Sequence, residues 1–122
     1  MNEEKLFLKG INEFNKKNYY YAHEYWEEIW NEIKIPDDKF LQGLIQLAVA
    51  YFHISNNNLI GAKSLFNKCI NKLVDYRPQH RGLNIESIIS HANNSLDTLI
   101  ENSSTINFNW ELAPILTIKK SD

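Results

Sequence analysis

A chain of 122 residues can bury one hydrophobic core but is too short for two ordinary domains, so we expect a single domain over residues 1–122. Its 13 Lys and Arg side chains nearly balance 15 Asp and Glu side chains, giving a formal net charge of -2, which disfavours nucleic acid as a partner. The start of the chain lacks the basic and apolar segments of a signal peptide, and no apolar run approaches the roughly 18 residues of a membrane span. We therefore expect a cytoplasmic protein without a membrane partner. Cys69 is the only cysteine, which excludes an intrachain disulfide.

Five segments carry apolar residues at helical spacing. The third runs from Phe40 to Ile54 and is apolar almost all round, a pattern typical of a helix surrounded by others. Ile35-Pro36 ends the segment before it, and Asp37 or Asp38 is expected to cap the third helix with a side-chain oxygen. The predicted helices lie near residues 3–17, 19–33, 38–55, 59–76 and 85–102.

The two halves of the predicted bundle repeat each other at a spacing of 40 residues. The shift places Ala22 on Ala62 and the turn residue Asn18 on Asn58, and it superimposes the apolar positions of the first helical pair on those of the second. A small residue early in the second helix of each pair is also how tetratricopeptide hairpins pack. The sequence therefore predicts an all-α fold, a compact five-helix bundle built from two tetratricopeptide-like helical hairpins plus a fifth helix and an extended C-terminal tail.

The tail occupies residues 103–122, after a bundle core of about residues 3–102. Its apolar residues alternate with polar ones from Ile106 to Leu112, which indicates an extended segment. Such a tail is too apolar to be free in water, so it either lies over an open edge of the bundle or exchanges with a partner molecule. Because the chain has more large apolar residues than five helices need, we expect a homo-oligomer, most simply a dimer.

A polar seam is predicted between the second and third helices. His23 and Glu27 are four residues apart on one helix face, and Gln42, Gln46 and His53 lie on one stripe of an otherwise apolar helix. Buried polar groups cost roughly 1–3 kcal/mol each unless they are satisfied, so we expect the two sets to face each other in a mostly buried seam. The candidate seam residues are His23, Glu24, Glu27, Gln42, Gln46 and His53. The seam is either a structural hydrogen-bond network or a ligand site, and His23, Glu27 and His53 would be the ligands of a metal.

A second candidate site is the loop after the fourth helix. Arg77, His80 and Arg81 lie close to Asn84, the expected cap of the fifth helix, and an anion could bind there. A solvated loop is the alternative interpretation.

Several of these segments resemble a known family, the one catalogued as domain of unknown function 309. The resemblance rests on Tyr21-Ala22-His23-Glu24, on Glu27 or Glu28 with Trp30, on Phe40-Leu41-Gln42-Gly43-Leu44-Ile45-Gln46-Leu47-Ala48 with His53, on Gly61-Ala62, on Tyr76-Arg77-Pro78, and on Arg81-Gly82-Leu83. It covers roughly residues 10 to 100. The resemblance implies a compact five-helix bundle, and it implies no established reaction, substrate or cofactor.

Two functions from different classes fit these observations. The leading hypothesis is a non-enzymatic protein-binding or assembly module, because paired hairpins offer a groove and no complete catalytic constellation is present. The alternative is a metal-binding protein or metal-dependent hydrolase that uses His23, Glu27 and His53, with water at the open position.

Overall fold

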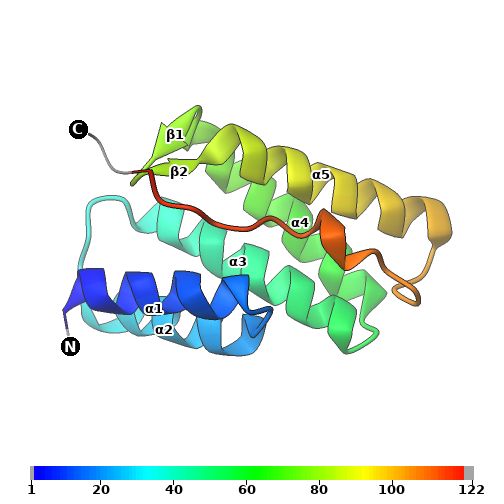
Figure 1. The fold of residues 1–122 in the computed structure, drawn as a ribbon, viewed down its shortest axis with the longest axis horizontal. Coiled ribbons are helices and arrows are strands. Elements are labelled where there is room, and N and C mark those ends of the chain that lie inside the picture. The colour runs from blue at the N-terminus through cyan, green and yellow to red at the C-terminus, as the bar shows by residue number, and fades with distance from the viewer. Residues whose placement is uncertain (1, 120–122) are drawn as a thin grey trace.

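The computed structural model describes residues 2–119, and this part of the chain folds into an all-α bundle of five helices (Figure 1). The helices are α1 (Glu3–Asn15), α2 (Tyr19–Glu32), α3 (Asp38–Ser55), α4 (Leu59–Leu73) and α5 (Ile85–Asn102). Each predicted helix is therefore confirmed to within about three residues, and α4 continues as a short 3₁₀ helix, η1 (Val74–Tyr76). None of the helices in residues 2–119 is long and apolar enough to cross a membrane.

Helix α3 lies at the centre of the bundle, as its apolar sequence predicts. It packs against α2 on one side and α4 on the other, and its side chains Leu44, Leu47 and Tyr51 are fully buried. The Tyr51 hydroxyl is 2.8 Å from the hydroxyl of Ser95, a fully buried serine of α5, so the polar end of this core residue is satisfied. The buried apolar residues form one contiguous core that includes all five helices.

The turns that join α1 to α2 and α3 to α4 have the same backbone geometry at a spacing of 40 residues. Lys17 and Asn57 both adopt a left-handed conformation, with φ of 66° and 57°. The amide of Asn18 bonds the carbonyl five residues earlier at 2.9 Å, and the amide of Asn58 does the same at 2.8 Å. The repeat found in the sequence is therefore reproduced in the hydrogen bonds of both turns.

A small β-hairpin separates η1 from α5, and the residue pattern does not predict it. Its strands are β1 (Gln79–His80) and β2 (Leu83–Asn84), paired antiparallel. Arg81 and Gly82 form the turn with φ of 49° and 78°, the left-handed pair that a two-residue hairpin requires. Arginine seldom occupies such a position, which is why no hairpin is expected here from the sequence.

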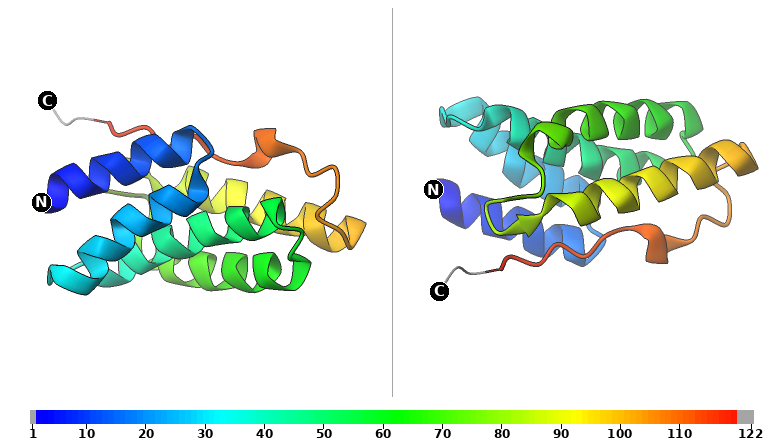
Figure 2. Two further views of the ribbon diagram at one scale, coloured as in Figure 1. Left: turned by 90° about the horizontal axis from the view of Figure 1, so that it is seen from below. Right: turned by 90° about the horizontal axis from the view of Figure 1, so that it is seen from above.

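The tail runs back along the bundle between α1 and α5 (Figure 2). After turns at residues 103–107 it is extended except for one 3₁₀ turn, η2 (Trp110–Leu112), and its side chains Phe108, Ala113 and Leu116 are buried. Of the two alternatives for the tail, this structure has the first, in which the tail covers an open edge of its own bundle.

Candidate functional site

The candidate site is the groove that the tail fills. Contacts of the tail with α1, α5 and α3 define this groove, with α1 and α5 as its walls and α3 in its floor. In Figure 1 the ribbon of the tail passes in front of α3 between the other two helices. Asn15 is the last residue of α1, Tyr51 is on α3, and His91 is on α5. All three contact the tail.

Asn15 binds the main chain of the tail with both ends of its side-chain amide. Its Nδ2 donates to the carbonyl oxygen of Leu116 at 2.9 Å, and its Oδ1 accepts from the amide nitrogen of Leu116 at 2.7 Å. An extended chain offers one donor and one acceptor per residue, and this side chain satisfies both groups of one residue. Asn15 therefore selects an extended segment without selecting the side chain at that position.

Aromatic side chains hold the middle of the tail. The Trp110 ring stacks on that of Tyr19, with centroids 5.8 Å apart and planes 18° from parallel, and packs edge-on against Phe108. Tyr51 contacts both tail rings from the floor of the groove, with centroid distances of 6.3 Å. Aromatic pairs of this kind add about 0.5–1.5 kcal/mol each beyond the area they bury.

Further main-chain contacts hold the tail from Trp110 to the end of the described chain. Nδ1 of His91 lies 2.9 Å from the Leu112 carbonyl oxygen, so the imidazole tautomer with a proton on Nδ1 donates here. The ammonium group of Lys17 donates to the Trp110 carbonyl at 3.3 Å. Near the end of the described chain, the Lys119 amide donates to the carbonyl of Gly82 at 2.8 Å.

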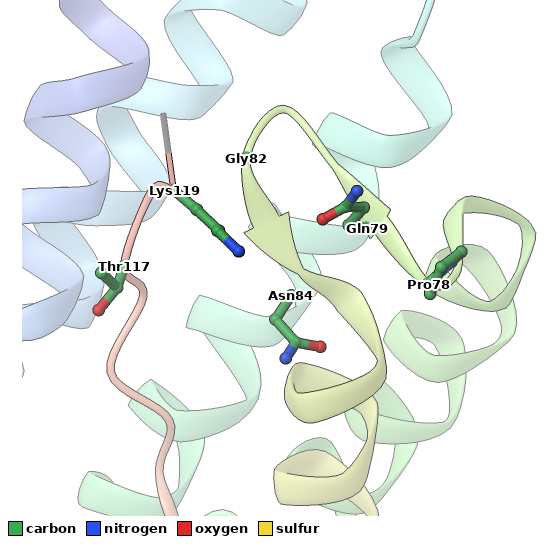
Figure 3. Close-up of a pocket in the computed structure, with 6 residues that line it drawn as sticks. All are labelled: Pro78, Gln79, Gly82, Asn84, Thr117 and Lys119. Carbon is green, nitrogen blue, oxygen red and sulfur yellow. The ribbon is translucent and has the colours of Figure 1, made fainter. Parts of the chain in front are cut away.

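Two cavities flank the tail where it reaches the hairpin. One has a volume of about 400 Å³ and lies between the tail and the hairpin (Figure 3). It is lined by Pro78, Gln79, Gly82, Asn84, Thr117 and Lys119. The other has a volume of about 530 Å³ and lies on the α1 side of the tail, lined by Glu3, Glu4, Phe7, Leu8, Arg81 and Ile118. The groove is therefore wider than the tail at this end.

The hairpin that borders these cavities is fixed by a cluster of charges. Arg81 donates to both carboxylate oxygens of Asp37, at 2.7 and 2.8 Å, and to Glu3 at 3.2 Å. His80 is 2.7 Å from the same Asp37 carboxylate. Partial burial of the Asp37 carboxyl favours its neutral form, but the hydrogen bonds from Arg81 and His80 and the charge of Arg81 outweigh that effect and lower its pKa to about 2.

This cluster changes two expectations from the sequence. The predicted cap of α3 is wrong, because Asp37 occupies the cap position but turns its carboxylate to the hairpin and makes no side-chain capping bond. The candidate anion-binding residues are held by carboxylates, Arg81 as described and Arg77 by Glu86 at 3.5 Å. An external anion at this loop would have to compete with three acidic side chains, from Glu3, Asp37 and Glu86.

The predicted seam residues lie on α2 and α3 as expected, and part of their pairing is visible. His23 Nε2 is 2.9 Å from a carboxylate oxygen of Glu27, while its Nδ1 is 2.7 Å from the Tyr20 carbonyl. His23 is mostly buried, with 20% of its side chain exposed, but Glu27 is 46% exposed, so a mostly buried seam is wrong for Glu27. Glu24 is exposed at the surface of the same helix.

The α3 side of the seam is only partly satisfied. Gln42, Gln46 and His53 are partly buried, and His53 pairs with Asn58 at the start of α4, at 3.4 Å. Oε1 of Gln46 is buried and has no partner among the described residues. Across residues 2–119, no hydrogen bond joins His23 or Glu27 to any of these three α3 side chains.

The structure bears on the predicted metal ligands and on the thiol of Cys69. In the described part of the chain, no group of three or more His, Cys, Asp or Glu side chains lies close enough to hold a metal ion, so His53 does not join His23 and Glu27 as a third ligand. Cys69 is fully buried, and burial raises the pKa of its thiol to about 12. The thiol is therefore neutral at physiological pH, as suits a core residue.

Comparison with known proteins agrees with the resemblance seen in the sequence. Residues 7–65, which run from α1 into α4, match the model of the family described as Domain of unknown function (DUF309). This segment belongs to the DUF309 family. The match includes Asn15 and all six seam residues, while the hairpin and the tail lie outside it. No curated protein and no solved structure matches the chain.

Proposed function

We propose that this chain is a non-enzymatic protein-binding module whose groove between α1 and α5 takes up an extended protein segment. In this structure the chain's own tail, residues 105–119, occupies the groove. A segment of another protein with the same chemistry, an extended main chain carrying apolar and aromatic side chains, would compete with the tail for it.

The observation that carries this proposal is the paired contact of Asn15 with both main-chain groups of Leu116. A tail that only covered apolar surface would need buried side chains and no such contact. Main-chain recognition is how proteins bind extended peptides, while neighbouring pockets for side chains supply specificity. Here Phe108 and Leu116 are the buried anchors, with 8% and 2% of their surface exposed.

Because the tail occupies the groove, it limits the apparent affinity with which an external segment can bind there. A competing segment binds only when the tail has left, so its apparent dissociation constant is the intrinsic value divided by the fraction of open molecules. The experiment should therefore separate the tail from the bundle without removing it. The exposed loop at Ser103 is a suitable place, because exposed loop tips tolerate insertion and cleavage.

We would insert a protease site after Ser103, cut it, and add a fluorescent peptide that covers residues 104–119. We expect the cut tail to stay with the bundle in gel filtration and the labelled peptide to replace it, with saturable anisotropy. Asn15→Ala should weaken peptide binding roughly tenfold, the effect of about 1.4 kcal/mol expected for losing a paired hydrogen-bond contact.

The matched control is Asn12→Ala, on an exposed position of the same helix, which should leave peptide binding unchanged. Failure of the labelled peptide to bind the cut protein, or equal binding to the Asn15→Ala and Asn12→Ala proteins, would contradict the proposal.

A further inference from the structure

The connection between α5 and the tail is short and has an unfavourable backbone. Helix α5 ends at Asn102, and Thr105 is already buried, with its hydroxyl 3.2 Å from the Asn57 side-chain oxygen. Within this connection Ser103 and Asn107 both have positive φ, of 49° and 63°. The left-handed region is strained for residues that have a Cβ atom, though least for asparagine. Folding the tail back over its own bundle therefore stores strain mainly at Ser103, in the hinge formed by residues 103–104.

We propose that the tail exchanges between two copies of this chain, so that each copy supplies residues 105–119 to the groove of the other. This inference rests on the proposed function, because it uses the same groove and names a second copy as the source of the extended segment. Every contact that the tail makes in its own groove is reproduced in the groove of an identical copy. The monomer with its own tail bound and the dimer with exchanged tails then differ mainly in the hinge, which can extend and lose its strain when the tail crosses to the partner.

The surroundings of the hinge fit such a crossing. Ile100 and Ile106 flank it and are 53% and 68% exposed, although both are large apolar residues. The hinge lies at the far end of α5, where it projects past the neighbouring helices in both views of Figure 2. In an exchanged pair the two hinges run side by side about the two-fold axis, where these isoleucines can be buried against each other.

The first test changes the strain of the hinge alone. Ser103→Val places a β-branched side chain at a left-handed position and disfavours the closed turn, whereas Ser103→Gly relieves it. Each protein would be refolded from urea at high concentration and its mass measured by light scattering. We expect the dimer fraction to be lowest for Ser103→Gly, intermediate for the unchanged protein and highest for Ser103→Val. A monomer mass for all three proteins, or equal dimer fractions in the two variants, would overturn the inference.

The second test asks whether the tail of one copy enters the groove of another. Asn15→Ala damages only the groove, and Leu116→Asp damages only the tail. A mixed pair can place the intact tail of the first chain in the intact groove of the second. We therefore expect native mass spectrometry of an equimolar, isotope-labelled mixture, refolded together, to show heterodimer in excess of the 1:2:1 ratio that random pairing gives. Leu116→Ala replaces Leu116→Asp if circular dichroism shows that the aspartate variant is unfolded.

The outcomes of these tests separate the inference from the proposed function. If the cut tail peptide binds in trans but the mixture gives no excess of heterodimer, the groove binds extended segments and the exchange between copies is wrong. If the peptide does not bind the cut protein, the proposed function itself is wrong.

Discussion

Trp26 lies against α1 because Gly10 has no side chain. The indole nitrogen of Trp26 donates to the Phe7 carbonyl at 3.1 Å, so the indole ring lies directly on the backbone of α1. A Cβ atom built on Gly10 would lie 2.1 Å from that nitrogen. Trp26 itself is fully buried and cannot move aside without opening the core.

We therefore expect Gly10→Ala to destabilise the protein although alanine is the better helix former. The propensity gain is about 1 kcal/mol and overpacking costs about 1–3 kcal/mol. Because the built Cβ lies only 2.1 Å from a buried ring, we expect a cost near the upper end and a net fall of about 2 kcal/mol in the free energy of unfolding. Urea denaturation measures this change. Asn12→Ala, on the exposed side of the same helix, is the control and should not destabilise. If Gly10→Ala left the protein as stable as before, the indole would not be packed as described.

The pairing of the Asp37 carboxylate with Arg81 and His80 contributes to the free energy of unfolding in a pH-dependent way. The folded-state pKa of Asp37, about 2, lies below the ordinary value of 3.8, so the ionised form is favoured by folding. This contribution is present above pH 3.8 and is lost as the pH falls towards 2. With solvent screening taken into account, we expect Asp37→Asn to cost about 1–2 kcal/mol at neutral pH.

The measurement is the stability difference between the unchanged protein and Asp37→Asn as a function of pH. The difference should be constant near neutral pH and should narrow between about pH 4 and pH 2. Glu86→Gln removes the exposed partner of Arg77 and serves as the control, with a difference near zero throughout. A stability difference for Asp37→Asn that does not change with pH would contradict the assigned pairing.

At the scale of elements, the turns α1–α2 and α3–α4 have the same backbone conformation, but the residue at the left-handed position differs in how much strain it carries. Lys17 adopts a conformation that favours glycine, whereas asparagine enters it more readily. Asn57 also accepts a hydrogen bond from the Thr105 hydroxyl at 3.2 Å, which ties its turn to the tail. The repeat is therefore geometric. Both turns also contact the tail, since the Lys17 ammonium group donates to the Trp110 carbonyl at 3.3 Å, but this contact is exposed whereas the Asn57 contact is partly buried.

We expect the same substitution to have different effects in the two turns. Lys17→Gly should raise the free energy of unfolding by about 0.5–1 kcal/mol, because relief of the left-handed strain exceeds both the entropy that glycine adds to the unfolded chain and the loss of the long, exposed hydrogen bond from Lys17 to the Trp110 carbonyl. Asn57→Gly should give no gain, because it removes the acceptor of Thr105. Parallel urea titrations test this, and an equal gain in both turns would show that the Asn57 contact is not formed in solution.

The helices could be predicted from the sequence and the site could not, for physical reasons. Apolar residues at helical spacing give five helices, because that spacing is imposed by the core each helix must reach. The hairpin escapes prediction because remote carboxylates, above all Asp37, hold Arg81 in a turn that its own preferences disfavour. The alternation of the tail predicts an extended segment, but its position depends on an open edge that exists only once the helices have packed.

The residues of the groove escape prediction for a related reason. Asn15 ends a helix, and no pattern distinguishes it from other surface asparagines. Polar residues on an apolar helix, such as Gln46, are conspicuous in the sequence. They predict a site at the seam between α2 and α3 and not at the groove. A partner residue 101 positions away along the chain leaves no local signal.

At the scale of the whole molecule, the bundle is a frame that holds an extended segment by its main chain. The segment touches α1, α3, α5 and the hairpin, so most of the fold takes part in binding it. The central claim is that Asn15 recognises the backbone of residue 116 and not its side chain.

The most direct test compares the tail peptide with a version in which an ester replaces the amide at residue 116, measured on the cut protein by fluorescence anisotropy. The ester has no N–H to donate to Asn15, and we expect it to weaken binding by about fivefold to tenfold, or about 1 kcal/mol. The same replacement at residue 115, on the exposed side of the tail, should have little effect, and in Asn15→Ala the residue 116 ester and the all-amide peptide should bind equally. Equal affinities of the two peptides for the unchanged groove would contradict recognition of the main chain by Asn15.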